Sequence, residues 1–440
     1  MRAFRRAFPI SLVLALVLGA PRASAEQGGY SKELMEEYFR EEAAKTHVPG
    51  AALVITNAEH TQLSLVTGVY PSADSPQIIG STTKSFTALA IMQLVEKGVV
   101  ALDTPAVAYL PERPRLADVT VRELLNHTSG FGTNQRLKNC KVGRQRGSFE
   151  YANVNYSLLG EIIEQVSGDS YADYLQKHIL DPLGMTHTYG DLAAAQADGL
   201  VPGNRNWFGF NFAQDMPYPG LFGSETLAAG YLITSPNDLA TYVRMYLQGG
   251  AAIISQQSIE QMWQGAPNYG FGWFVGEQKI HHAGMVENYV SSIAMVPERG
   301  LAAVMVVPAQ DYLVASPMFE HIEDGVVAQL HGRSPAPLQS SYLLRHMGIN
   351  AVYISLLGIA AIPLIRIRRW RAKPYPLAVD LAIHLGMPVV LCVLPLAAGS
   401  TWRMVRLFVP DAFWVTTLSA VGLLAGGVWK LQDMVKRRRA

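Results

Sequence analysis

The chain has 440 residues, of which 49% are hydrophobic and only 16% are charged, and its formal net charge is +1. This composition excludes a disordered protein, and the near-neutral balance argues against a nucleic-acid-binding protein. Two cysteines are too few for a disulfide-rich scaffold. The charge is unevenly divided: residues 1–25 carry four arginines and no acid, residues 26–340 carry 19 basic and 32 acidic side chains, and residues 341–440 carry 13 basic and 3 acidic ones. We therefore expect three physically different segments.

The N-terminal segment is typical of a secretory signal peptide. Basic residues precede a short apolar core at residues 10–20, and Ala23-Ser24-Ala25 fits an A-x-A cleavage site. The alternative is an uncleaved membrane anchor, but an apolar core of about 11 residues is too short to cross roughly 30 Å of hydrocarbon. We expect residues 1–25 to be removed during export.

Residues 26–338 are predicted to form one domain with an α/β fold. Short runs rich in Val, Ile, Leu and Thr predict strands near both ends of this segment, and helical patterns lie between them. The predicted strands cover residues 51–56, 63–67, 271–275, 291–296 and 302–307, and the predicted helices cover residues 83–97, 119–125, 157–166 and 235–247. This order indicates one sheet built from both chain ends, with a helical insertion.

The C-terminal hundred residues contain three apolar runs that are long enough to cross a bilayer as helices. These runs cover residues 349–365, 377–398 and 407–429. The loop after the first run and the C-terminal tail are strongly basic, which places both in the cytoplasm. We therefore expect a three-helix transmembrane domain over residues 347–435 in the cytoplasmic membrane, with residues 26–338 on the periplasmic or extracellular side.

The second apolar run contains one pair of ionisable residues and one cysteine. Asp380 and His384 are four residues apart and share one helix face, and ionisable groups at membrane depth are candidates for a functional site. The plainer alternative is that Asp380 reaches the interface and His384 pairs with it or with a neighbouring helix. Cys392 is expected within the membrane and Cys140 outside it, so no intrachain disulfide is expected.

The first motif that could carry chemistry is Ser81-Thr82-Thr83-Lys84, at the start of a predicted helix. The spacing places the serine hydroxyl and the lysine amine on one face, one turn apart. Free N–H groups at a helix N-terminus favour a developing oxyanion, and a lysine among apolar neighbours would have a lowered pKa and take the serine proton. The alternative is an N-cap serine followed by a surface lysine, and the motif alone does not decide between them.

Two later triplets point the same way. Tyr151-Ala152-Asn153 precedes a predicted helix, and a tyrosine beside a lysine ammonium approaches the phenolate form and serves as a general base. Asn153 would hold a substrate amide. His282-Ala283-Gly284 is expected to precede a strand, with a glycine that permits close approach of the backbone to a ligand. Taken singly, each triplet also fits ordinary packing and capping.

Taken together and in this order, the S-x-x-K, Y-x-N and H-x-G motifs resemble the signature of the serine β-lactamase-like hydrolases. That family includes class C β-lactamases and low-molecular-weight penicillin-binding proteins. Further phrases that resemble the family lie at residues 47–51, 124–130, 181–185 and 269–273. The resemblance runs from about residue 30 to residue 330 and implies a β-lactamase/transpeptidase-like fold with no cofactor and no metal.

The resemblance also implies roles for individual residues. Ser81 would be the acylated nucleophile, Lys84 its activating partner and Tyr151 the proton shuttle. The backbone N–H groups of Ser81 and Met285 would form the oxyanion hole. The substrate-binding residues implied in this way are Asn153, His282, Gly284, Met285 and Asn288.

Two histidines compete with His282 for a role. His281 is its neighbour, but His282 is preferred because a glycine follows two residues later. His127 belongs to the His127-Thr128-Ser129-Gly130 phrase, which is structural in the family, so we do not expect it to be catalytic.

A narrower resemblance concerns architecture. An exported hydrolase of this family followed by three membrane helices resembles the membrane-anchored, prodrug-activating (colibactin-maturing) peptidases, which remove an N-acyl-D-asparagine cap. Asn288 matches an asparagine that this subgroup uses to recognise the D-Asn side chain. The sequence departs from the subgroup at Asn153, where a serine is expected, and it has Glu225 and Thr226 where the subgroup has a recognition histidine.

The sequence therefore predicts a membrane-tethered serine hydrolase or peptidase that cleaves an amide or ester of a small peptide-like or acyl-D-amino-acid substrate. Within that class, a D,D-carboxypeptidase or penicillin-binding protein, a class C-type β-lactamase and an esterase stay open. From other classes, the alternatives are a non-catalytic wall- or peptide-binding module and a transporter or sensor that uses Asp380 and His384. The physiological substrate and the oligomeric state are not predicted.

Overall fold

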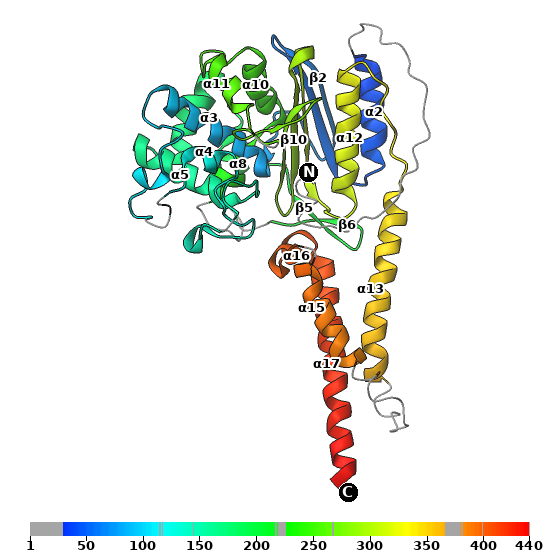
Figure 1. Cartoon of the computed structure of the whole chain (residues 1–440). Coiled ribbons are helices and arrows are strands. Elements are labelled where there is room, and N and C mark those ends of the chain that lie inside the picture. The colour runs from blue at the N-terminus through cyan, green and yellow to red at the C-terminus, as the bar shows by residue number, and fades with distance from the viewer. Residues whose placement is uncertain are drawn as a thin grey trace.

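The computed structural model describes residues 30–439 except residues 114, 115, 117, 144, 216, 217, 219–225, 266, 267, 366–378, 380, 381 and 398. The predicted signal peptide, the first basic loop of the membrane segment, Glu225 and Asp380 therefore lie outside the described residues. In Figure 1, a domain of mixed helices and strands stands at one end of a bundle of long helices.

A six-stranded antiparallel sheet with the order β2-β1-β11-β10-β9-β8 forms the centre of the globular domain. Its strands are β1 (Gly50–Asn57), β2 (Thr61–Gly68), β8 (Phe274–Val275), β9 (Ile280–Met285), β10 (Val290–Val296) and β11 (Leu301–Val307). Strand β1 from the start of the domain pairs with β11 from its end, with Ala52 opposite Val306 and Asn57 opposite Leu301. The predicted sheet built from both chain ends is confirmed.

Helices cover both faces of this sheet. Helices α2 (Lys32–Ala44) and α12 (Ala315–Leu330) lie side by side on one face. The helical region on the other face comprises α3 (Thr83–Glu96), α4 (Val121–Leu125), α5 (Asn153–Ser167), α6 (Tyr171–Leu175), α7 (Asp181–Leu183), α8 (Leu192–Ala197), α9 (Leu227–Gly230), α10 (Pro236–Leu247) and α11 (Gln256–Met262). Because both faces are covered, β11 is buried throughout and its sequence is a continuous apolar run.

Helix α3 is the central helix of the larger core. Every residue from Thr83 to Leu94 is buried, so the helix has no polar face and carries Lys84 into the interior. It follows directly on the 3-10 turn η1 (Gly80–Thr82), which contains Ser81.

Two small sheets complete the globular domain. One has the order β3-β7-β4 and consists of β3 (Gln77–Ile78), β7 (Ile233–Thr234) and β4 (Thr188–Tyr189). The other has the order β12-β5-β6 and consists of β12 (Ala309–Gln310), β5 (Asn204–Trp207) and β6 (Phe210–Ala213). The second of these lies at the end of the domain that faces the long helices (Figure 1).

Two predicted strands differ from the structure. The strand expected at residues 271–275 is limited to Phe274–Val275, because the chain passes α3 closely at Gly272, where a Cβ atom would lie 2.9 Å from the Lys84 carbonyl oxygen. His282-Ala283-Gly284 does not precede a strand but lies inside β9, where His282 pairs with Ile293 of β10. The sequence of this triplet gave no strand signal of its own, because pairing with β10 decides the conformation.

The C-terminal segment contains α13 (Tyr342–Ile365), a π-helical turn (Ala382–Gly386) that leads into α15 (Met387–Ala397), α16 (Trp402–Phe408) and α17 (Pro410–Arg439). Two stretches, Tyr342–Ile362 and Pro410–Asp433, are long and apolar enough to cross a membrane. A third candidate is bent by 80° between Ile383–Ala397 and Trp402–Phe408.

The bend lies just after the second apolar run, which was predicted to end at residue 398. Gly399 has a positive φ of 70° there, a conformation that glycine adopts without strain. Helix α16 lies largely between the second and third predicted runs. His384 lies against α17, where a Cβ atom on Gly427 would come within 2.8 Å of it. This position agrees with the plainer alternative for His384, in which it packs on a neighbouring helix.

Candidate active site

The first two predicted residues meet at the start of α3. Ser81 is half-buried in η1, whereas Lys84, one turn further on, is fully buried. The Lys84 Nζ atom lies 3.1 Å from Ser81 Oγ, so the amine and the hydroxyl are hydrogen-bonded as the i, i+3 spacing predicts.

The Lys84 amine has further partners from two other elements. It donates to Asn153 Oδ1 at 2.7 Å and to the carbonyl oxygen of Ala229 in α9. Its nitrogen also lies 4.9 Å from the centre of the Tyr151 ring and 5.7 Å from that of Tyr156. All these partners are neutral, and burial lowers the pKa of Lys84 well below the ordinary value. A lysine held in this way has the properties of a general base.

Tyr151 lies next to Lys84, but burial shifts its pKa in the opposite direction. Burial raises the pKa of Tyr151, while a hydrogen bond with Ser81 acts in the opposite direction. This direction favours the protonated phenol over the phenolate base that the sequence suggested. With the base at Lys84, the Tyr151 hydroxyl is suited to donate or relay a proton.

The loop that carries Tyr151 is held by a buried histidine. His127 adopts a left-handed conformation with φ of 58°, and its Nδ1 atom accepts the backbone N–H of Ala152 at 3.2 Å. Asn155 Nδ2 lies 2.9 Å from the same nitrogen, and Asn155 Oδ1 accepts from Ser129 Oγ at 2.6 Å. His127 is thus a support for the Tyr151 loop, in agreement with its predicted structural role.

The third motif passes directly over the nucleophile turn. A Cβ atom on Gly284 would lie 1.8 Å from the Ile79 carbonyl oxygen, and one on Gly80 would lie 2.3 Å from the Met285 backbone nitrogen. Both positions require glycine, and Gly284 serves the close approach of two protein backbones rather than of a ligand. As a result, the Met285 N–H group lies beside the turn that holds Ser81, as an oxyanion hole requires.

His282 and its neighbour His281 point to opposite faces of β9. His282 is 1% exposed, its Nε2 atom lies 3.1 Å from the Tyr269 hydroxyl and its Nδ1 atom lies 2.8 Å from the Ala283 carbonyl oxygen. The carbonyl only accepts, so Nδ1 carries the proton and Nε2 accepts from Tyr269. Burial, followed by the nearby Lys84, lowers the pKa of His282 well below its usual value. Both ring nitrogens are thus engaged within the protein, and the ring is neutral.

Comparison with known proteins identifies the family. A family model described as Beta-lactamase matches residues 35–315, which is more than half of the chain. The chain belongs to the beta-lactamase family. This family consists in general of serine hydrolases, so the Ser81–Lys84 pair lies in a hydrolase fold.

The relatives extend the family assignment. The chain is similar to protein flp of Staphylococcus aureus, with 24% identity over 86% of each chain. It is also similar to the octameric penicillin-binding protein homologue from Pyrococcus abyssi, with 30% identity, a TM-score of 0.59 and coverage of 68% of this chain and 77% of that one. The D-amino acid amidase from Ochrobactrum anthropi shares the fold, with 21% identity, a TM-score of 0.57 and coverage of 68% and 98%.

Asn288, expected to recognise substrate, has a hydrogen-bond partner within the protein. It is 4% exposed, and its Nδ2 atom donates to the Gln214 carbonyl oxygen at 3.0 Å. The neighbouring Glu287 is also buried, and its carboxylate lies 3.4 Å from the Tyr231 hydroxyl. Both side chains are buried and engaged within the protein, in the segment that follows Met285.

Several supporting residues were missed from the sequence. The Ala229 carbonyl leaves no side-chain signal, because any residue supplies one. Tyr269 begins a family-like phrase but was assigned no role, and Asn155 was not singled out. Among the described residues, no group of three or more His, Cys, Asp or Glu side chains is arranged to hold a metal.

Proposed function

We propose that this protein is a membrane-anchored serine hydrolase that cleaves an amide or ester through an acyl-serine intermediate outside the cytoplasm. The observation that carries the proposal is the 3.1 Å contact between Lys84 Nζ and Ser81 Oγ, made by an amine whose pKa is lowered by burial.

In the proposed reaction, the neutral Lys84 amine takes the proton of Ser81 as the hydroxyl oxygen attacks the substrate carbonyl carbon. The negative charge on the carbonyl oxygen is stabilised by the N–H groups of Ser81 and Met285. As the carbon–nitrogen bond breaks, the Lys84 proton passes through the Tyr151 hydroxyl to the leaving amine. Water then gives a proton to Lys84 as its oxygen attacks the ester carbon. Lys84 returns this proton to the Ser81 oxygen as the carbon–oxygen bond to Ser81 breaks and the carboxylic acid is released.

The substrate we favour is an amide of a D-amino acid or a small peptide-like amide with a D residue. Two similar solved structures are those of a D-amino acid amidase and a D-stereospecific amidohydrolase, which supports this class. The penicillin-binding protein homologue supports a D,D-carboxypeptidase as the second candidate. A neutral His282 with both nitrogens engaged offers no cation to a substrate carboxylate, which argues against an efficient β-lactamase. The buried Asn288 carboxamide likewise argues against the specific D-Asn cap of the prodrug-activating peptidases.

The proposed membrane location rests on the C-terminal helices. We propose three spans, with the bent α15–α16 pair as the second, the basic C-terminal tail in the cytoplasm and the globular domain outside. Exposed aromatic side chains lie where the two long spans begin: Phe210 and Phe212 on β6 are 68% and 54% exposed, and Trp414 near the start of α17 is 47% exposed. Aromatic residues are enriched at such membrane–water interfaces. Protease digestion of intact spheroplasts should therefore remove the globular domain while leaving the C-terminal tail protected.

The catalytic proposal is tested with Ser81→Ala. The full-length variant should lose hydrolysis of p-nitrophenyl acetate and covalent labelling by a fluorophosphonate, because the attacking oxygen is gone. Ser64→Ala, which changes an exposed serine of β2, is the matched control and should react like the wild type. Full labelling of Ser81→Ala, measured by intact mass spectrometry, would show that Ser81 is not the nucleophile.

A further inference from the structure

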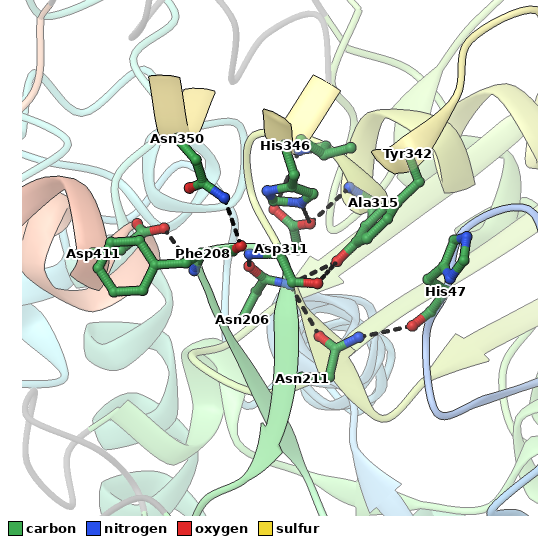
Figure 2. A network of polar contacts seen from close by, with 12 residues as sticks. His47, Asn206, Phe208, Asn211, Asp311, Ala315, Tyr342, His346, Asn350 and Asp411 are labelled. Carbon is green, nitrogen blue, oxygen red and sulfur yellow. Dashed lines mark hydrogen bonds and ion pairs between the residues drawn. The ribbon is translucent and has the colours of Figure 1, made fainter. Parts of the chain in front are cut away.

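The β5–β6 hairpin makes polar contacts with the C-terminal helices α13, α16 and α17. Figure 2 shows polar side chains of α13 and α17 converging on this hairpin. The turn residues Phe208 and Gly209 both have positive φ angles, 57° and 94°, which is the geometry of a tight two-residue hairpin turn. The turn therefore projects two backbone peptide groups toward the helices.

Two C-terminal helices bind the backbone groups of the same turn residue, Phe208. Asp411 at the start of α17 accepts the Phe208 N–H at 3.1 Å, and Asn350 of α13 donates to the Phe208 carbonyl oxygen at 2.9 Å (Figure 2). The hydroxyl of Tyr353 on α13 lies 3.4 Å from the Asp411 carboxylate and connects the two helices to each other.

The first turn of α13 adds a second set of contacts. The Tyr342 hydroxyl donates to the Gly209 carbonyl oxygen at 3.0 Å and accepts from Asn206 Nδ2 at 2.8 Å. His346 Nε2 lies 2.8 Å from Asp311 Oδ2, and both residues are buried. A Cβ atom on Gly209 would lie 3.0 Å from His346, so the turn is packed tightly against the helix.

Helix α16 contacts β5, the first strand of the hairpin. Arg205 of β5 donates to the carbonyl oxygens of Arg406 and Leu407 at 3.0 and 2.6 Å, which places a cation on the C-terminal end of this helix. A guanidinium at this position complements the carbonyl groups that a helix leaves unpaired at its end. All three helices that adjoin the globular domain thus bind one two-stranded hairpin.

The end of the hairpin opposite its turn contacts Asn288, in the segment that follows Met285. The Asn204 backbone N–H donates to the Asn288 carbonyl oxygen at 3.2 Å, while the Asn288 carboxamide donates to Gln214, directly after β6. A Cβ atom on Gly203 would lie 2.3 Å from Asn288 Nδ2, so no gap separates the hairpin from this segment. The carboxamide of Gln310, in the strand that pairs with β5, lies 3.5 Å from the Met285 sulfur.

We propose that the β5–β6 hairpin transmits the position of the membrane helices to the oxyanion side of the active site. On this proposal, Asn350 and Asp411 are positioning residues for catalysis: they hold the turn, and the rigid hairpin holds the chain from Met285 to Asn288. A helix that served only as a tether would need no buried polar contacts with the domain, because a short linker suffices. The inference rests on the proposed acyl-serine mechanism.

The test uses the full-length protein in lipid nanodiscs with p-nitrophenyl acetate as the probe. Asn350→Ala and Asp411→Leu should each lower kcat by about tenfold or more with little change in KM, because small displacements of groups around the reacting carbon are costly. Asp411→Asn keeps an acceptor oxygen for the Phe208 N–H and should restore most of kcat. This rescue distinguishes a positioning role from a general loss of folded protein.

The matched controls are Ser355→Ala on α13 and Thr417→Ala on α17, whose hydroxyls bond only to carbonyls of their own helices in the structure's described part. Both should retain the wild-type kcat. If Asp411→Leu does not fold, Asn350→Ala alone carries the test. Wild-type kcat in folded Asn350→Ala, with Ser81→Ala inactive, would overturn the positioning role and leave the hydrolase mechanism intact. Activity in Ser81→Ala would instead overturn the mechanism itself.

Discussion

The two faces of the six-stranded sheet each hold a lysine that is largely removed from water, and the two lysines are held in opposite ways. Lys84, on the face covered by α3, is 0% exposed and contacts neutral oxygens. Lys279, just before β9, contacts α12 on the other face, where its Nζ atom lies 2.6 Å from Glu323 and 3.2 Å from Asp324. The charge of the neighbouring groups, rather than burial itself, distinguishes the two lysines.

The pKa directions follow from these partners. Burial lowers the pKa of Lys84, and no carboxylate among the described residues is in hydrogen-bond contact to oppose it. Burial acts in the same direction on Lys279, but the carboxylates of Glu323 and Asp324 outweigh it and raise the pKa. A buried lysine without a counter-ion is prepared to accept a proton, whereas one with a counter-ion serves stability.

The largest expected effect is that of Lys84→Met. Removal of the general base should lower kcat/KM for p-nitrophenyl acetate by about 10²- to 10⁴-fold. The melting temperature should stay the same or rise, because methionine has a similar length and removes an amine that is buried without a counter-ion. Steady-state kinetics and thermal unfolding of the same preparation check both parts.

The pH profile of the wild type gives an independent check on Lys84. The protonated amine accepts no proton, so kcat/KM should fall as the pH drops through the pKa of Lys84, which lies below the ordinary lysine value. Lys279→Met should show the same profile. A profile that instead follows an unperturbed lysine would contradict the assignment of Lys84 as the base.

Lys279→Met should have the opposite consequences. The substitution leaves Glu323 buried without its main counter-ion, and we expect a loss of about 3 kcal/mol in the free energy of unfolding, with kcat/KM almost unchanged. The exposed Lys97 offers a matched control, since Lys97→Met should change neither quantity. Urea denaturation of the three proteins measures the difference.

The same pair predicts how stability depends on pH. Burial acts to raise the pKa of Glu323, but Lys279 and His281 outweigh it and lower the pKa from 4.5 to about 2. A carboxyl with a depressed folded pKa contributes stability that is present above pH 4.5 and is lost as the pH falls toward 2, here about 3 kcal/mol. In Lys279→Met this loss should be smaller. An equal acid sensitivity in both proteins would show that the pair does not shift the pKa of Glu323.

The contrast between the two lysines also shows what the sequence could predict. The contact of Ser81 with Lys84 depends on spacing within one helical turn, so it was accessible from local geometry. The partners of Lys84 that keep it neutral come from α5 and α9, far along the chain, and the Ala229 carbonyl has no sequence signature at all. The substrate-binding roles of His282 and Asn288 were implied by the family resemblance alone. Their partners Tyr269 and Gln214 were not predicted, because they become neighbours only through tertiary packing.

The fold shows the same limit. The sheet from both chain ends was predictable because β1, β10 and β11 are continuous or nearly continuous apolar runs. Strand β9 contains His281, His282 and Gly284 and carries no such pattern, so its place in the sheet depended on pairing with β10. Helix α16 and the bend before it were not predicted, because they lie largely between the second and third apolar runs, and hydropathy reports the length of an apolar run and not its direction.

The smallest expected effects distinguish the two faces of β9 itself. His282→Phe removes the acceptor of the Tyr269 hydroxyl and should cost about 1–3 kcal/mol of stability, because a buried hydroxyl loses its partner. His281→Phe keeps the ring contact with Phe274, whose centroid lies 5.5 Å away, and should cost less than about 1 kcal/mol. Only His282→Phe should also lower kcat, since Tyr269 lies against the ring of His127, which holds the Tyr151 loop. If His281→Phe impaired kcat as much as His282→Phe, the proposed difference between the two faces of β9 would be wrong.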